Sequence, residues 1–287
     1  SILPRSKLPP EARTLNNMWV LKVKRDKDGN IARYKARLVI KGYGQIQGID
    51  YFESFASVVK FKSLRILIAI AAEYGLNLTQ MDVKTAFLNG DLEEDVYMEL
   101  PEGFKDVYGA EFILKLKKGL YGLKQAPRQW KKKLVAFLLK LGFYQCENDD
   151  CVFVLRDGDS YLYMAVYVDD LIMADNDTKL RDKVAKALCE EYEMDDIGRL
   201  EFFLGVKVEY TKEGIWLKQD AYIDKMAERF NLESCNYEAL PATPGIILSK
   251  EDSPTTSKDM KEMKEIPYAN AVGAELYAAI GTMVQIS

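Results

Sequence analysis

Two neighbouring runs near the start of the chain alternate between apolar and basic residues. Residues 18–24 and 34–41 both have the period of two that is typical of a half-buried strand. Residues 28–30, Asp-Gly-Asn, lie between them and favour a tight turn. The pattern therefore predicts a hairpin. Its basic residues would form a cationic ribbon, composed of Lys22, Lys24, Arg33, Lys35, Arg37 and Lys41.

The rest of the chain switches between helical and strand periodicity. Helices are predicted at residues 63–74, 130–142, 177–193 and 219–230, with Ser63 and Asp177 as N-cap residues of the first and third. Short strands are predicted at residues 78–83, 151–155, 161–168, 171–174 and 202–210. Residues 1–14 are expected to be irregular, and residues 241–267 to form a linker or loop. This alternation predicts an α+β fold with an antiparallel sheet.

The run of residues 161–174 is apolar or aromatic except for two neighbouring carboxylates, Asp169 and Asp170. A charge buried in such a run loses its hydration without compensation. A tight hairpin would lift both carboxylates to its tip, where a divalent cation can neutralise them. An exposed turn with solvated aspartates is the simpler explanation of the dipeptide taken alone, so the metal interpretation depends on other residues.

Composition sets wide limits. A chain of 287 residues, 48% hydrophobic and 29% charged, can bury a substantial core in one large domain or in two to three subdomains. No apolar stretch is long enough to cross a bilayer, and no segment has the pattern of a signal peptide. The chain begins at Ser1 without a methionine and ends at Ser287 within an expected helix. We therefore expect a fragment of a longer protein.

The absence of histidine narrows the chemistry. It excludes, within this chain, Ser-His-Asp and Cys-His catalysis and every zinc site that uses histidine. Chemistry must rely on carboxylates, lysines, tyrosines or thiols, for which oxygen-ligated Mg²⁺ or Mn²⁺ is the best match. The four cysteines have no Cys-x-x-Cys spacing and are expected to be free thiols in a reducing compartment.

The net charge of −4 conceals two basic blocks. Residues 1–62 carry thirteen Lys and Arg against five Asp and Glu, and residues 105–140 carry ten against two. Such blocks can bind a polyanion although the chain as a whole is acidic. Solvated lysine faces explain either block alone equally well.

A third carboxylate, Asp82, ends a short predicted strand 87 residues before Asp169. Two carboxylates from separate strands can bridge two cations about 3.5–4 Å apart, which is the geometry of in-line phosphoryl displacement. One ion would activate a hydroxyl and the other would hold a triphosphate. Because neighbouring side chains on a strand point in opposite directions, we expect Asp82 and Asp169 to be the main ligands, with Asp170 in support.

Four segments then occur in a characteristic order: residues 79–92 around Asp82, residues 119–130 (Gly-Leu-Tyr-Gly-Leu-Lys-Gln-Ala-Pro-Arg-Gln-Trp), residues 167–170 (Tyr-Val-Asp-Asp) and residues 203–208. Together they resemble the reverse transcriptase of the Ty1/copia group of LTR retrotransposons. The resemblance extends from about Trp19 to at least Tyr277, and the second segment is its most specific part.

The resemblance implies a right-hand polymerase. Residues 15–79 and 92–122 would form the fingers, residues 80–91 and 123–212 the palm, and residues 213–287 the start of a thumb or connection. Its activity would be RNA-directed and DNA-directed DNA synthesis on a primed RNA or DNA template with dNTPs. The remaining parts of the polyprotein, such as RNase H and integrase, would lie outside this chain, and the location would be cytoplasmic, including virus-like particles.

The resemblance also implies roles for individual residues. The catalytic set is Asp82, Asp169 and Asp170, and the ligands of two Mg²⁺ or Mn²⁺ ions are Asp82, Val83, Asp169 and Asp170. The dNTP-binding set is Lys24, Lys35, Arg37, Lys84, Thr85, Phe87 and Gln125. Its first three members are candidates among the six basic residues of the ribbon, for each of which a solvated side chain is the alternative. Phe87 would exclude a 2′-hydroxyl, although a core phenylalanine is its alternative. The primer-positioning set is Tyr167, Leu204 and Gly205.

One departure from the family pattern concerns Asp195, which stands where many relatives carry a basic residue. The role of a lysine that protonates pyrophosphate is therefore unassigned. Two other functions compete with reverse transcription. A decayed copy would bind nucleic acid without catalysis, which the intact carboxylates argue against, and an RNA-templated RNA polymerase is disfavoured by Phe87.

Overall fold

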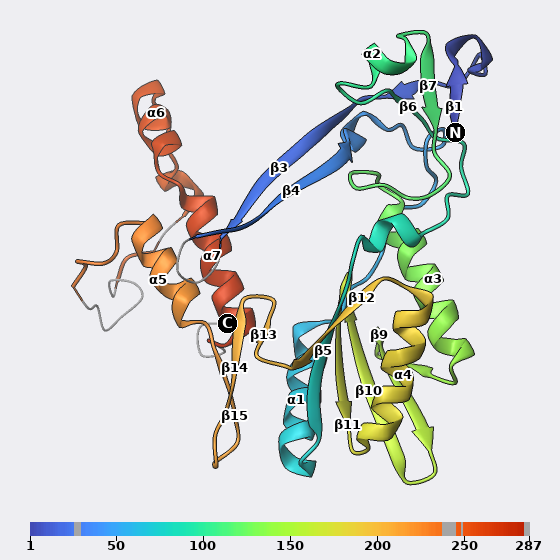
Figure 1. Ribbon diagram of the computed structural model, residues 1–287. Helices are drawn as coiled ribbons and strands as arrows, with labels where there is room; N and C mark the ends of the chain where they lie inside the picture. Colours follow the sequence, from blue (N-terminus) through green and yellow to red (C-terminus); the bar gives the residue numbers. More distant parts are fainter. Residues whose placement is uncertain (26–29, 237–244, 248, 284–287) are drawn as a thin grey trace. The chain divides into compact units, whose positions relative to one another are not determined.

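The computed structural model describes residues 1–25, 30–236, 245–247 and 249–283 (Figure 1). The chain divides into two compact units, Ser1–Arg199 and Leu200–Ser287. Helices and several sheets are present in a mixed α+β arrangement, as the alternating periodicity predicts. No helix among the described residues has the length and apolar character that a membrane span requires.

A six-stranded sheet forms the centre of the first unit. All of its strands are antiparallel to their neighbours. In spatial order they are β12 (Met194–Arg199), β5 (Asn77–Val83), β11 (Asp170–Asp175), β10 (Ser160–Tyr167), β9 (Asp149–Asp157) and β8 (Tyr144–Cys146). The antiparallel sheet that the sequence predicts around the two aspartates is thereby confirmed.

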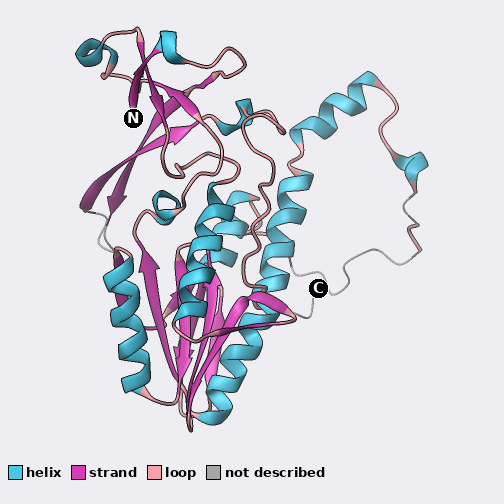
Figure 2. Cartoon of the chain, turned by 90° about the vertical axis from the view of Figure 1, so that its right-hand side faces the viewer, coloured by secondary structure: helices cyan, strands magenta, loops and turns pink. Residues whose placement is uncertain are grey.

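Helices cover both faces of this sheet (Figures 1 and 2). On one face α3 (Ala126–Lys140) and α4 (Thr178–Glu191) pack against alternate residues of the central strands. The core there is fully apolar, with Met81, Leu134, Leu138, Met164, Leu171 and Leu188 each at most 1% exposed. On the other face α1 (Phe61–Tyr74) contacts β5 and β11. This packing fixes the central strands, and therefore the carboxylates at their ends.

Two smaller sheets complete the first unit. The predicted basic hairpin is a two-stranded ribbon of β3 (Asn17–Arg25) and β4 (Ile31–Ile40). A four-stranded sheet has the order β1 (Ile2–Pro4), β7 (Phe112–Lys115), β6 (Tyr97–Glu99) and β2 (Thr14–Leu15). Short helical turns occur at η1 (Arg5–Lys7), η2 (Gly42–Gly44), η3 (Ala86–Asn89) and α2 (Lys105–Tyr108).

The second unit contains a three-stranded antiparallel sheet and several helices. Its strands are β13 (Phe202–Phe203), β14 (Val206–Tyr210) and β15 (Ile215–Lys218). Its helices are α5 (Asp220–Arg229), α6 (Ser257–Glu265), α7 (Tyr268–Gly281) and the short η4 (Lys250–Asp252). The Tyr222 hydroxyl donates to the Ala274 carbonyl at 2.9 Å, which joins α5 to α7.

Two helix boundaries differ from the sequence prediction. Ser63 is not an N-cap, because α1 begins at Phe61 with Lys60 as its cap residue. The cap is supplied from outside the helix: the Asp149 carboxylate on β9 accepts from the Lys60 backbone N–H at 3.0 Å and from the Ser63 hydroxyl at 2.6 Å. The third predicted helix does start at Asp177, whose side chain accepts from the Lys179 N–H.

Helix α3 starts at Ala126, four residues before the predicted start at Trp130. Pro127 does not prevent this, because the backbone N–H groups of a helix's first turn have no partner within the helix and the missing N–H of proline costs nothing there.

Two segments that were expected to be irregular contain regular structure. Within residues 1–14, β1 pairs with β7 in the register Ile2↔Leu114, so the partner lies more than a hundred residues away. Within residues 241–267, α6 forms after the Thr256 cap although none of its residues is buried. Both predictions of irregular structure are therefore wrong at these positions. The turn predicted at residues 28–30 lies outside the described residues except for Asn30.

Candidate active site

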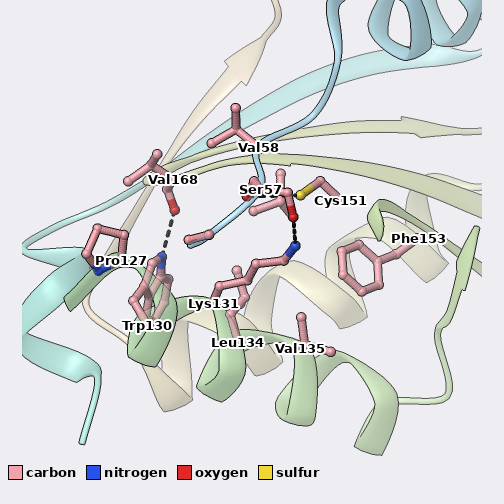
Figure 3. Close-up of a pocket in the computed structure, with 12 residues that line it drawn as sticks. Ser57, Val58, Pro127, Trp130, Lys131, Leu134, Val135, Cys151, Phe153 and Val168 are labelled. Carbon is pink, nitrogen blue, oxygen red and sulfur yellow. Dashed lines mark hydrogen bonds between the residues drawn. The ribbon is translucent and has the colours of Figure 1, made fainter. Parts of the chain in front are cut away.

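The paired aspartates lie at a two-residue turn between β10 and β11. Tyr167 and Asp170 face each other across the hairpin, so Val168 and Asp169 form the turn itself. Val168 has a φ of 57°. This left-handed conformation is strained for a β-branched residue, and such strain is concentrated at functional sites. The turn is held from one side by the buried indole of Trp130, which donates to the Val168 carbonyl at 2.7 Å (Figure 3).

Strand β5 brings the third carboxylate to this turn. Asp82 lies directly opposite Asp170 in the β5–β11 register, so their side chains leave the same face of the sheet. The backbone N–H of Val83 donates to the Asp169 carbonyl at 2.8 Å and fixes the turn against β5. Gln80, two residues before Asp82, donates to the Asp170 carboxylate at 2.9 Å. The structure thus brings together the three carboxylates that the sequence predicts to be catalytic.

Burial and mutual repulsion disfavour the ionised forms of these carboxylates. Burial raises the pKa of Asp82, and the negative charges of Asp169 and Asp195 raise it further. Burial also raises the pKa of Asp170, although the hydrogen bond from Gln80 opposes that change. Carboxylates that are desolvated and face other carboxylates are stabilised by a cation. The donor set is all oxygen, which suits Mg²⁺ or Mn²⁺.

Strand β12 adds a fourth carboxylate that sequence reasoning did not assign to the site. Asp195 lies opposite Asp82 in the β12–β5 register. It pairs with the Lys84 ammonium group at 2.9 Å, and Glu193 approaches the same group at 3.6 Å. The Lys84 N–H is also in use, since it donates to the Glu193 carbonyl at 2.8 Å. Thr85, the next residue, is exposed and has a φ of 54°.

The basic ribbon presents most of its charges on one face. Lys22 pairs with Lys35 and Lys24 with Arg33 across the strands, so the four side chains point the same way. Burial lowers the pKa of Lys35, and the charge of Arg37 lowers it further, whereas Asp82 acts in the opposite direction. Lys35 therefore lies within the electrostatic reach of the carboxylate site. Lys24 interacts with other charges of the ribbon, and it is one of the cations that lower the pKa of Lys35.

An aromatic pair lies beside the carboxylates. The ring of Phe87 on η3 meets the ring of Tyr121 edge to face, with 5.0 Å between centroids. The Arg37 guanidinium lies over the Tyr121 ring at 5.4 Å. Burial raises the pKa of Tyr121, and the charges of Asp169 and Asp82 act in the same direction. Tyr121 is therefore a site residue that sequence reasoning missed, although it stands within the specific segment of residues 119–130.

Gln125 is buried within a hydrogen-bonded network. Its side chain is fully buried, with its amide donating to the Asp50 carbonyl at 2.9 Å and its carbonyl accepting from Gln45 at 2.9 Å. Gln45 in turn accepts from the Lys124 backbone N–H at 2.8 Å. The structure shows Gln125 as a link between the loop at residues 45–50 and the start of α3, and its contact with a nucleotide stays a prediction.

The predicted primer-positioning residues belong to different units. Tyr167 ends β10 and is half-buried next to the turn. Leu204 and Gly205 form the turn between β13 and β14 in the second unit, with φ values of 46° and 75°. The Tyr277 hydroxyl donates to the Leu204 carbonyl, and a Cβ at Gly205 would come within 2.7 Å of that hydroxyl. Glycine is therefore favoured at position 205 both by the positive φ and by the lack of room for a Cβ.

A second acidic cluster lies at the start of β9. Asp149, Asp150 and Cys151 bring one ligand atom each to within 4.8 Å of one another, and among the described residues no other trio of acidic or thiol groups does so. Their ligand atoms already have partners: Asp149 caps α1, and Asp150 accepts from Lys131 at 2.6 Å. Burial raises the pKa of the Cys151 thiol. The cluster therefore has a structural explanation that needs no metal.

Comparison with known proteins identifies the family of this chain. Residues 4–244 match the family model described as reverse transcriptase (RNA-dependent DNA polymerase). The chain is 41% identical over 283 residues to a retrovirus-related Pol polyprotein from transposon TNT 1-94 of Nicotiana tabacum, which covers 98% of this chain and 21% of the relative.

Two further relatives extend the match to another plant and to yeast. A retrovirus-related Pol polyprotein from transposon RE1 of Arabidopsis thaliana is 40% identical over 80% of this chain and 16% of its own length. A transposon Ty1-LR2 Gag-Pol polyprotein of Saccharomyces cerevisiae is 26% identical over 90% of this chain and 15% of its own. The chain spans about a fifth or less of these relatives. With the family model matching most of its length, the chain belongs to the reverse transcriptase (RNA-dependent DNA polymerase) family and corresponds to that domain of retrotransposon Pol polyproteins.

Proposed function

We propose that this chain extends a primer 3′-hydroxyl with dNTPs on an RNA or DNA template, by two-metal nucleotidyl transfer. The observation that carries the proposal is the pairing of Asp82 with Asp170 across β5 and β11, with Asp169 in the adjoining turn. A packed sheet holds these oxygen donors in place while their own charges repel. Such an arrangement costs stability, and it is suited to holding divalent cations.

The metal set would be Asp82, Asp169 and the backbone carbonyl of Val83, with Asp170 in support. Two Mg²⁺ or Mn²⁺ ions would supply Lewis acidity to the attacking and leaving oxygens when bound. Gln80 would keep Asp170 oriented through its 2.9 Å hydrogen bond. The Val83 N–H and the Trp130 indole would together hold the turn, and so keep the backbone of Asp169 beside β5.

The incoming nucleotide would lie between the ribbon and the carboxylates. Lys35 and Arg37 are the best placed of the predicted phosphate ligands, because their charges reach Asp82 and Tyr121 respectively. Phe87, buttressed by Tyr121, would form the floor beneath the sugar and exclude a 2′-hydroxyl. Lys24, Lys84, Thr85 and Gln125 stay in the proposed nucleotide-binding set, Gln125 as the anchor of the loop at residues 45–50.

The subdivision into fingers, palm and thumb is part of the proposal. The palm would comprise residues 80–91 and 123–212, with most of the six-stranded sheet. The fingers would comprise residues 15–79 and 92–122, with the ribbon and part of the four-stranded sheet, and residues 213–287 would start the thumb. Template and primer phosphates would meet the two basic blocks, with Tyr167 and the turn at Leu204 and Gly205 positioning the primer. RNase H and integrase regions of a longer polyprotein would act with it, inside the cell and within particles.

The test is primer extension on an RNA template with dNTPs and Mg²⁺ or Mn²⁺, with an Asp169→Asn variant measured beside the parent. We expect extension by the parent and a loss of about a thousandfold or more in the variant, because the loss of metal stabilisation removes several kcal/mol from the transition state. Equal extension by both proteins would overturn the role of Asp169. Binding of primer-template without extension by the parent would overturn catalysis by this chain and leave nucleic-acid binding as its function.

A further inference from the structure

A small pocket lies against the turn that carries Asp169. Its volume is about 60 Å³, and its walls come from residues 56–58, α3, β9, β10 and the turn itself (Figure 3). The apolar side chains that define it are Val58, Pro127, Trp130, Leu134, Val135 and Val168. No role in the reaction described above involves this space.

The polar groups at one end of the pocket pair with one another. The Lys131 ammonium group donates to Asp150 at 2.6 Å and also to the Ser57 hydroxyl. The Cys151 thiol donates to the Ser57 carbonyl at 3.2 Å. A polar guest would have to compete with these bonds, and burying a polar group away from this end would cost it hydration without return. The remaining side chains of the lining are apolar, so the pocket favours uncharged, apolar molecules.

Two of the wall residues control the catalytic turn. Val168 is the strained residue of the turn, and Trp130 holds the Val168 carbonyl through the 2.7 Å hydrogen bond. In Figure 3 both residues stand at the same end of the pocket, and the dashed line joins the Trp130 indole to the Val168 carbonyl. A guest that presses on either side chain acts on a strained backbone segment that the Trp130 indole and the Val83 N–H hold by one hydrogen bond each. The next residue along the chain is Asp169.

We propose that this pocket binds a small hydrocarbon-like molecule and that its occupancy shifts Asp169. The volume is below the roughly 150 Å³ of an engineered cavity that accepts benzene, so the guest that fits within the walls has the size of xenon or cyclopropane. A larger apolar ligand would place one such group in the pocket and the rest outside it. Occupancy of the pocket would then lower the rate of nucleotide transfer. This consequence rests on the proposed function.

The first experiment is xenon titration of the ¹⁵N-labelled chain, followed through the indole N–H signals of its three tryptophans. We expect a saturable shift of the Trp130 signal and of the Asp169 amide, with Trp19 and Trp216 unaffected. No selective shift at Trp130 would overturn the site. A shift at Trp130 without one at Asp169 would overturn the coupling to the turn.

Filling the pocket supplies the matched control. Val135→Phe on α3 and Val58→Phe on the opposite wall should each abolish the xenon-induced shift. Leu139→Phe should preserve it, because Leu139 lies on the same helix but is 48% exposed and does not line the pocket. Circular dichroism identifies a variant that fails to fold, in which case the other filling variant decides. Retention of the shift in a folded filling variant would place xenon elsewhere and overturn the proposal.

The kinetic consequence is measured separately. Primer extension at a saturating xenon pressure should fall severalfold in the parent and stay constant in Val58→Phe. An equal fall in both would show that xenon acts outside the pocket. If the parent does not extend a primer even without xenon, the proposed function fails, and the binding experiment still decides whether the pocket exists.

Discussion

The central sheet and the ribbon of β3 and β4 contribute opposite charges to one site by opposite means. The sheet carries Asp82 and Asp170 at the ends of strands whose neighbours, such as Met81 and Leu171, are completely buried. The ribbon carries Lys35 on two strands with no third strand and with most residues exposed. On its other face Leu21 and Tyr34 are 76% and 77% exposed.

The difference follows from what each partner must do. Carboxylates that hold metal ions must keep their spacing to a fraction of an ångström, and only a packed sheet offers that precision. Cations that bind a triphosphate must follow a ligand that enters and leaves, and long side chains on an open ribbon allow this motion. The comparison predicts that substitutions in the sheet change chemistry and folding, whereas substitutions on the ribbon change binding.

The largest expected effect is on catalysis, at Asp82. Asp82→Asn should reduce primer extension by about a thousandfold or more, because it removes a metal ligand. The same variant should be at least as stable as the parent at neutral pH, since the raised pKa of Asp82 means that its ionised form opposes folding. Steady-state extension rates and thermal unfolding check the two parts. A variant that is less stable than the parent would show that the ionised Asp82 side chain stabilises the folded state, contrary to this prediction.

The pH dependence has a definite sign. Because the folded-state pKa of Asp82 lies above its ordinary value of 3.8, the folded state binds more protons in the window between those two values. Asp82 therefore makes stability fall as pH rises through that window. The difference in unfolding temperature between the parent and Asp82→Asn should shrink as the pH is lowered through the mildly acidic range. Parallel curves would contradict this sign.

The second effect is on stability and compares one leucine from each region. Leu171→Ala in the sheet should cost about 2–5 kcal/mol, because the side chain is fully buried in the core. Leu21→Ala on the ribbon should change stability by only about 0.5 kcal/mol or less. Chemical denaturation of both variants provides the measurement. Similar losses would mean that the exposed face of the ribbon is covered in solution.

The third effect concerns the turn. Trp130→Phe removes the donor to the Val168 carbonyl and should destabilise the protein by about 1–3 kcal/mol. Its activity should fall more than unfolding explains, because the strained turn relaxes and moves Asp169. Trp216→Phe, at a residue that is 52% exposed, provides the matched substitution. Normal activity in folded Trp130→Phe would show that Val83 alone positions the turn.

The fourth effect separates two lysines of the ribbon. Lys35→Gln should raise the KM for dNTPs by about tenfold, the cost of about 1.4 kcal/mol for a charge-assisted contact that is partly screened. Lys24→Gln should raise it less, because the charge of Asp82 acts on Lys35. Steady-state kinetics at fixed salt measures both, with kcat as the internal reference. Equal changes would mean that the ribbon acts through its summed charge.

The smallest effect concerns Asp195. Asp195→Asn removes a negative charge that raises the pKa of Asp82, and so the acidic limb of the activity profile should move to lower pH. Stability should change little, because the ion pair with Lys84 is largely exposed. Glu193→Gln is the control, since Glu193 also meets Lys84 but on a longer contact of 3.6 Å. A shift of the limb to higher pH would contradict the assigned interaction.

Local pattern predicted most of the sheet and the carboxylates. The strands around Asp82 and Asp169 have the periodicity and residue types of buried strands, and the Asp177 cap is a purely local signal. Two of the misses share one cause. The α1 cap at Asp149 and the pairing of β1 with β7 join residues far apart in the chain, and a pattern within a window does not contain its distant partner.

Residue patterns along the chain identified the strands that carry Asp82, Asp169 and Asp170, and the order of the motifs assigned these carboxylates to one set through the family resemblance. Folding placed Lys35 and Arg33 within electrostatic reach of Asp82 and Asp195 opposite it. It also brought Tyr121 within reach of these charges, buried Gln125 and set the Trp130 indole against the Val168 carbonyl. Those facts depend on strand register and on which side chains exclude water from one another. Register and burial arise only when distant segments pack.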